Sequence, residues 1–262
     1  MNGDAVEAHV AVTAAGDSPV DHVAEVRLTR PPNNYFSVAM ITELAEALER
    51  LDDDRSCRAV VLAADGKHFC AGADFSGPST GSTADLYAAA ARLFRTRKPV
   101  VAAVQGAAIG GGLGVALAAD FRIAAPEARF SANFARLGFH QGFGLSVTLP
   151  ALVGQQRAAE LLYTGRRVNG EEAAAIGLAD EVVPLGGLLD AALRLAGEIA
   201  ASAPLAVESI RTTLRGDLAD RIEEATRHEL AEQERLRATP DFREGTSAMA
   251  ERRTPNFTGE TS

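Results

Sequence analysis

Cysteine is scarce in this sequence. The two cysteines, Cys57 and Cys70, are too few for the disulfide framework that many small secreted proteins use. The N-terminal stretch also lacks the order of a secretion signal, a charged segment followed by an apolar one, and carries acidic Asp4 and Glu7 instead. These absences favour a cytoplasmic location.

Basic residues are in the minority. The sequence has 26 Lys and Arg against 35 Asp and Glu, which gives a formal net charge of -9. A nucleic-acid-binding protein needs a basic face to neutralise phosphates, so we expect no nucleic-acid partner. An anionic ligand must therefore find a local basic patch.

One stretch, residues 99–119, carries no charge and is long enough to cross a bilayer. Its five glycines and many alanines weaken that interpretation. A strand over 100–104, a glycine turn and a buried helix explain the same residues, and we expect no membrane partner.

The pattern of apolar residues predicts an α/β fold. With 47% hydrophobic residues in a chain of 262, a large core can form. Strands are expected at 23–28, 60–63, 100–104, 121–124 and 181–183, and helices at 37–51, 85–95, 113–119 and 155–163. Strands and helices alternate along the chain, as in α/β proteins. After Pro204 the sequence becomes helical and rich in charge.

Two loops, 66–74 and 106–114, each follow an apolar, β-branched strand. Small residues at 71–73 and three glycines at 110–112 allow backbone N–H groups to approach a ligand oxygen closely. The second loop runs into an apolar helix, so its amides lie at the positive end of a helix dipole. Together the two loops predict an oxyanion hole.

Other glycine-loop chemistries do not fit. The glycines at 110–114 lack the Gly-x-Gly-x-x-Gly spacing of a dinucleotide site, and no Gly-Lys-Ser/Thr of a phosphate-binding P-loop is present. Neither NAD nor ATP is implied, and we assign no metal site.

Six segments in order resemble the crotonase (enoyl-CoA hydratase/isomerase) superfamily. They lie at 30–34, 66–74, 98–112, 158–167, 176–180 and 241–255. The resemblance implies a crotonase-like spiral of ββα units with a CoA-thioester site over residues 1–200. It also implies a helical C-terminal oligomerisation region over 201–262 and assembly as a homotrimer or homohexamer.

The resemblance assigns roles to individual residues. The backbone N–H groups of Ala73 and Gly111 match the two oxyanion donors, and Lys67 matches a lysine that contacts the CoA phosphates. The expected CoA-binding set is Lys67, Ala71, Gly110 and Gly142. Coenzyme A is part of the thioester substrate, and no permanently bound cofactor is expected.

Both catalytic glutamates of the family's hydratases are missing from the matching positions, which hold Gly114 and Phe134. We therefore expect poor hydration of simple enoyl-CoA esters, and restored hydration on replacing both residues by Glu, provided that the new side chains fit. His140 is a candidate replacement acid or base, and a structural role for it stays open. A catalytic role and a structural role also both stay open for His68. Asp120 is expected to be a structural acid at a helix end.

The function predicted from these residues is that of an acyl-CoA-processing lyase or isomerase that stabilises a thioester enolate with a divergent acid-base set. Hydration, isomerisation, decarboxylation and thioester hydrolysis all remain open. Decarboxylation forms the enolate without a base, so missing glutamates impair it least. The alternative is a non-catalytic acyl-CoA-binding protein with the same fold.

Overall fold

Two β-sheets organise the chain in a computed structural model that describes residues 9–73 and 81–261. The first sheet has the order β1 (Val10–Thr13), β2 (Val23–Leu28), β3 (Ala59–Ala64), β4 (Val100–Val104), β6 (Phe121–Ala124) and β9 (Glu181–Val182). Its neighbouring strands are parallel except for the antiparallel pair β1–β2. In the second sheet β7 (Arg129–Ser131) lies between β5 (Ala107–Ile109) and β8 (Val168–Asn169). The predicted α/β class is confirmed.

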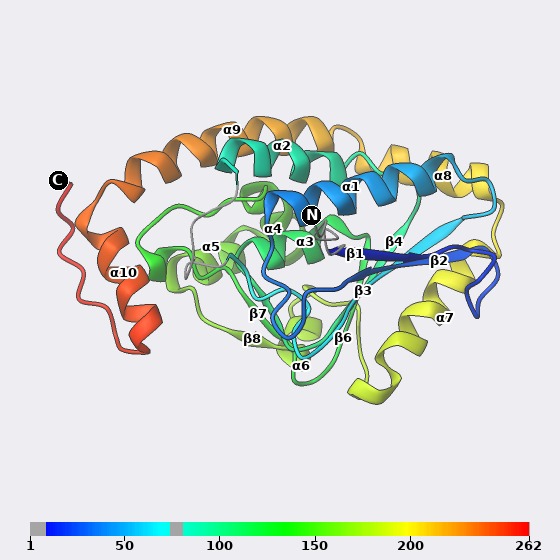
Figure 1. The fold of residues 1–262 in the computed structure, drawn as a ribbon, viewed down its shortest axis with the longest axis horizontal. Coiled ribbons are helices and arrows are strands. Elements are labelled where there is room, and N and C mark those ends of the chain that lie inside the picture. Colours follow the sequence, from blue (N-terminus) through cyan, green and yellow to red (C-terminus); the bar gives the residue numbers. More distant parts are fainter. Residues whose placement is uncertain (1–8, 74–80, 262) are drawn as a thin grey trace, which may run out of the picture.

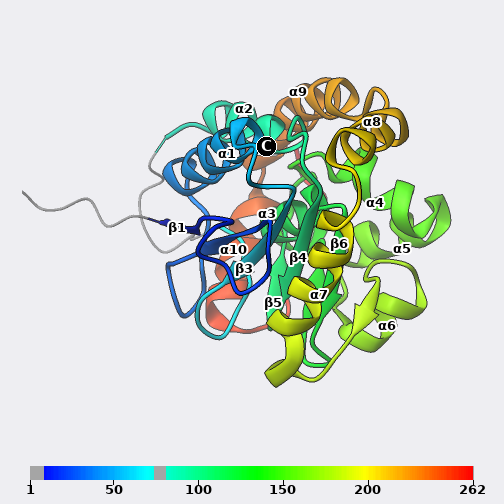
Figure 2. The same cartoon turned by 90° about the vertical axis from the view of Figure 1, so that its right-hand side faces the viewer.

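Helices cover both faces of the larger sheet and also pack on one another. The α-helices of the described residues are α1 (Val38–Asp53), α2 (Thr83–Leu93), α3 (Gly111–Ala118), α4 (Leu145–Val153), α5 (Gln155–Thr164), α6 (Gly170–Ala175), α7 (Leu188–Ala200), α8 (Pro204–Arg215), α9 (Leu218–Arg237) and α10 (Pro240–Glu251). Figure 1 shows α1, α2 and α9 as a layer above the sheet. Helix α7 lies on the other side, in front of the strands in Figure 2.

The central strands β3 and β4 are buried on both faces. Val60 and Leu62 of β3 belong to the core that includes α1 and α2, whereas Val61 and Ala63 pack in a second core with α7. Parallel strands covered on both sides read as continuous apolar runs, which is why the sequence revealed them clearly.

The uncharged stretch 99–119 divides into β4, β5 and α3. Helix α3 begins at Gly111, two residues before the predicted start, and all eight of its residues are buried. None of the helices in residues 9–73 and 81–261 is long and apolar enough to span a membrane.

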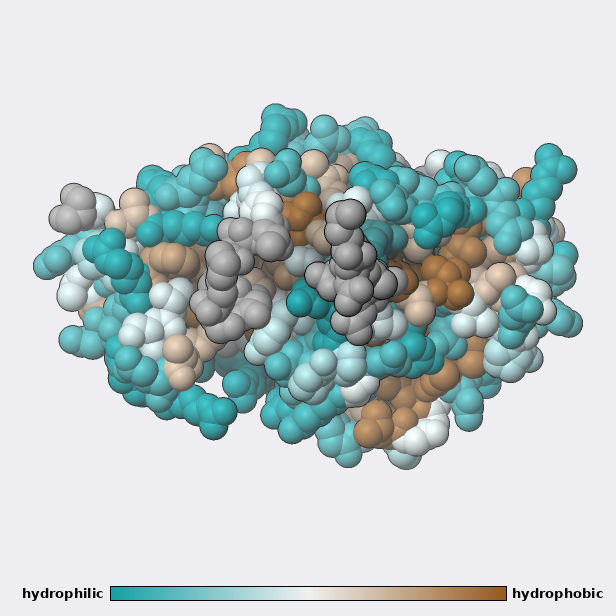
Figure 3. Space-filling view, in the orientation of Figure 1, coloured by the Kyte–Doolittle hydropathy of each residue, from teal (hydrophilic) through white to brown (hydrophobic). Residues whose placement is uncertain are grey.

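The C-terminal region is helical, as predicted, and α9 packs beside α2 and α4. On α8, Leu205 is 80% exposed and Leu214 is 82% exposed. Most of the face in Figure 3 is hydrophilic, with apolar patches toward the lower right, where α7 lies in Figure 1. Trimeric or hexameric assembly stays a prediction, and the exposed leucines of α8 are the kind of surface it needs.

Candidate active site

The two predicted loops lie against each other. The Cys70 N–H donates to the Ala107 carbonyl (2.9 Å), and the Ile109 N–H donates to the Cys70 carbonyl (3.0 Å). These bonds extend the pairing of β5 by a parallel bridge between Cys70 and Ala108. A side-chain carbon on Gly112 would fall 2.2 Å from the Cys70 carbonyl oxygen, so the close contact requires glycine there.

Only some amides of these loops are available to a ligand. Ala71 donates its N–H to Asn33 O (2.9 Å), and Gly110 donates its N–H to Ser131 O (2.8 Å). These two amides hold the loops in place, so any CoA contact by Ala71 or Gly110 must use other atoms. Within residues 9–73 and 81–261, the N–H groups of Ala73 and Gly111 donate to no other residue. They are the two amides predicted as oxyanion donors.

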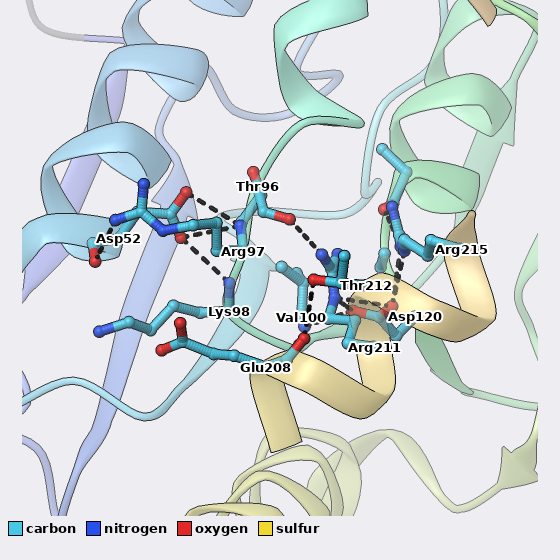
Figure 4. Close-up of polar contacts among 12 residues, drawn as sticks. Asp52, Thr96, Arg97, Lys98, Val100, Asp120, Glu208, Arg211, Thr212 and Arg215 are labelled. Carbon is cyan, nitrogen blue, oxygen red and sulfur yellow. Dashed lines mark hydrogen bonds and ion pairs between the residues drawn. The ribbon is translucent and has the colours of Figure 1, made fainter. Parts of the chain in front are cut away.

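Helix α3 carries one donor at its first residue and is anchored at its other end. The Arg215 Nη2 donates to Ala118 O (2.9 Å), and the Arg122 Nη1 donates to Ala119 O (3.1 Å). Asp120 follows the helix and accepts from the Nε atoms of Arg211 and Arg215, as Figure 4 shows. Cations near the C-terminal carbonyls interact favourably with the dipole of α3, whose positive end lies at Gly111, and so stabilise the helix.

We expect Asp120→Asn to lower the free energy of unfolding by about 3 kcal/mol, because it leaves two largely buried guanidinium groups without their shared negative charge. Urea unfolding measures the loss. The matched control is Asp53→Asn, since Asp53 pairs with Arg97 but is 83% exposed, and such pairs contribute about 0–1 kcal/mol. Equal unfolding midpoints for the two variants would contradict this account of the α3 anchor.

The first loop is also held by His68. Its Nδ1 accepts from the Ala107 N–H (3.1 Å), which makes it a link to the second loop. Burial, together with the charges of Arg129 and Lys67, lowers the pKa of His68, which favours the neutral ring whose Nδ1 can accept this hydrogen bond. Of the two roles left open for His68, catalytic and structural, this hydrogen bond supports the structural one.

Neighbouring Lys67 is exposed and forms no ion pair within the described part of the chain.

Burial raises the pKa of the Cys70 thiol to about 12, so Cys70 is not an activated nucleophile. Asp74 lies outside the described residues.

Aromatic rings occupy the surroundings of the two positions matched to the hydratase glutamates. A side-chain carbon on Gly114 would fall 2.5 Å from Cδ1 of Phe143. The Phe134 ring is buried, lies near Gly110, and packs edge-on against Phe139 with ring centroids 5.4 Å apart. Among the described residues, the side-chain atoms nearest to Gly110 and Gly114 are therefore those of Asn133, Phe134 and Phe143, and none of them is a carboxylate.

His140 contacts α9. Its ring lies edge-on to His228, with centroids 5.7 Å apart, and its carbonyl accepts from the Gln233 side chain (2.8 Å). Nearby Gly142 is buried and packs against the Tyr87 hydroxyl. Among the described residues, no hydrogen bond or ring contact joins His140 to Ala73 or Gly111. Its catalytic role stays a prediction.

Sequence reasoning missed two residues of this site, Phe36 and Phe143. Phe36 lies next to Ala73 and its ring contacts Gly111. Phe143 lies in the glycine-rich loop 138–144, the same loop as the predicted residue His140. The signal for Phe143 was its place between Gly142 and Gly144; for Phe36 the sequence carries no signal.

The chain is similar to known proteins over most of its length. The family description "Enoyl-CoA hydratase/isomerase" matches residues 20–260. The chain is 36% identical over 248 residues to carnitinyl-CoA dehydratase of Proteus mirabilis, covering 90% of this chain and 95% of that protein.

Two solved structures are also similar. The crystal structure of carnitinyl-CoA hydratase from Mycobacterium avium superimposes with a TM-score of 0.85 at 30% identity, covering 97% of this chain and 99% of that chain. An enoyl-CoA hydratase/isomerase from Pseudoalteromonas atlantica T6c gives a TM-score of 0.83 at 30% identity, covering 95% and 100%. Similarity at this level extends over nearly the whole chain.

Proposed function

The chain belongs to the enoyl-CoA hydratase/isomerase family, whose enzymes act on acyl-CoA thioesters, and we propose that its backbone amides at Ala73 and Gly111 stabilise a thioester enolate. The observation that supports this most is that both N–H groups donate to no residue in the described part of the chain, although both loops are tightly paired. Two preorganised donors of this kind stabilise negative charge as it develops on a carbonyl oxygen.

The reaction that best suits the surroundings is decarboxylation of a 2-carboxyacyl thioester. The bond between the α-carbon and the carboxylate breaks, its electron pair passes into the enolate, and CO₂ leaves. Water then supplies the proton that completes the acyl thioester. No protein base is required, which fits a site that has Gly114 and Phe134 at the matched acid positions. Release of CO₂ from malonyl-CoA, compared with hydration of crotonyl-CoA, tests the choice.

The second candidate is an acyl-CoA-binding protein without catalysis. The observation in its favour is that the described side chains nearest to Gly110 and Gly111 are those of Phe36, Asn133 and Phe134, and none of these is an acid or a base. Turnover of malonyl-CoA separates the candidates. An enzyme that stabilises the enolate releases CO₂ and, in heavy water, forms a product that carries deuterium on its α-carbon, whereas a binding protein holds malonyl-CoA unchanged.

We expect Lys67→Ala to weaken CoA-thioester binding about fivefold, the effect of losing one exposed ion pair of about 1 kcal/mol. Lys67 is exposed and stands at the start of the first loop, beside His68, which links that loop to the second one. Titration calorimetry measures the affinity. Arg55→Ala is the control, because this exposed cation precedes β3 whereas Lys67 follows it. Equal affinities of wild type and Lys67→Ala would remove Lys67 from the site.

A further inference from the structure

Phe36 lies between the two proposed oxyanion donors. Its N–H donates to the Gly72 carbonyl (3.1 Å), and its backbone forms a parallel bridge with Ala73. Its ring reaches the other loop, because a side-chain carbon on Gly111 would fall 2.3 Å from Cε1 of Phe36. The ring is partly exposed. A thioester whose carbonyl oxygen binds both amides must therefore meet this ring.

Phe143 fills the space beyond Phe36. The two rings lie with centroids 6.2 Å apart and planes tilted by 56°. Phe143 is 1% exposed, and its ring occupies the volume that any side chain at Gly114 would need. The site is thus closed by aromatic carbon where the chain leaves the glycine turn.

The backbone keeps Phe143 in this place at a cost. Its φ of 63° is in the left-handed region, which bulky residues rarely adopt. Such strain persists only where the surroundings impose it. Here the buried Glu229 carboxylate of α9 accepts from the N–H groups of Gly144 (2.8 Å) and Ser146 (3.0 Å), which fixes the loop directly after Phe143.

We propose that Phe36 and Phe143 set the acyl specificity of this site, and that the pair admits short acyl groups and rejects long ones. This inference rests on the proposed function, because it takes the amides of Ala73 and Gly111 as the point where the thioester carbonyl binds. Phe36 is the specificity residue that touches the acyl group. Phe143 acts through Phe36 and is a positioning residue that blocks the volume beyond it.

The test compares two saturated thioesters, butyryl-CoA and decanoyl-CoA, by titration calorimetry. Wild type is expected to bind butyryl-CoA more tightly than decanoyl-CoA. Phe36→Ala and Phe143→Leu are each expected to shift the ratio of the two dissociation constants toward decanoyl-CoA by about tenfold, a change typical of added room in an apolar pocket. Phe36→Leu replaces Phe36→Ala should the larger truncation fail to fold.

Phe130→Leu is the matched control. Phe130 is as buried as Phe143, at 1% exposure, but lies on β7 beside Leu113 and Leu149. It should lose stability without a change in the ratio. Two outcomes overturn the inference. If the Phe36 and Phe143 variants bind both thioesters with the wild-type ratio of dissociation constants, the two residues do not set the specificity, and the proposed function is unaffected. If wild type binds free CoA as tightly as it binds butyryl-CoA and decanoyl-CoA, both the proposed function and the inference are wrong.

Discussion

Gly111→Ala is expected to lower turnover of the thioester substrate by about 10²- to 10³-fold, the loss typical of one oxyanion donor. The new methyl carbon would fall 2.3 Å from Cε1 of Phe36, so the ring and the start of α3 cannot both keep their places. Since the donor is the N–H of the substituted residue, a shift of the backbone displaces the donor itself. Steady-state kinetics of CO₂ release from malonyl-CoA measures the effect.

Gly186→Ala is the control for this experiment. An added side-chain carbon there meets no atom within 4 Å, and Gly186 lies in the short 3-10 turn before α7. It should retain wild-type activity. Undiminished activity in Gly111→Ala would show that the Gly111 amide does not stabilise the reacting oxygen.

Much of the sheet was predictable, because the local pattern of apolar residues indicates each strand without knowledge of its neighbours. The predicted bounds 23–28, 100–104 and 121–124 are those of β2, β4 and β6. Strand β4 is an uninterrupted apolar run, as a parallel strand buried on both faces requires. Strand β2 instead alternates apolar residues with Glu25 and Arg27, which is the period of two typical of a strand. The start of α3 was harder to predict, because glycine disfavours helices and only burial among tertiary neighbours stabilises this helix at Gly111.

The candidate site was predictable as far as its backbone goes. The small residues of both loops revealed where two chain segments approach, and the structure shows them bonded at Cys70 and Ala107. The side chains around them were not predictable. Phe36 reaches Gly111 across a tertiary contact, and His140 meets α9 through His228, far along the chain. Such contacts depend on how distant elements pack, and a local pattern does not record this.

Gly114→Glu is expected to unfold more readily than wild type, and not to become a hydratase. The sequence alone led us to expect that glutamates at 114 and 134 would restore hydration where they fit, but Phe143 leaves no room at Gly114. Its Cδ1 lies 2.5 Å from the position of the first side-chain carbon. Overpacking of this kind costs about 1–3 kcal/mol. A carboxylate buried without a partner costs several kcal/mol more, so the unfolding midpoint in urea should fall sharply.

The double variant Gly114→Glu with Phe143→Ala separates the two costs. Removing the ring opens the volume that the glutamate needs, so the pair should lose less stability than the sum of the single variants. Additive losses would show that Phe143 is not what excludes a side chain at Gly114.

The rate of crotonyl-CoA hydration tests the function of these two positions. The wild-type rate should be low, because the side chains of Gly114 and Phe134 transfer no proton. A wild-type kcat/KM on the order of 10⁶ M⁻¹s⁻¹, typical of efficient enzymes, would mean that another acid performs the water activation.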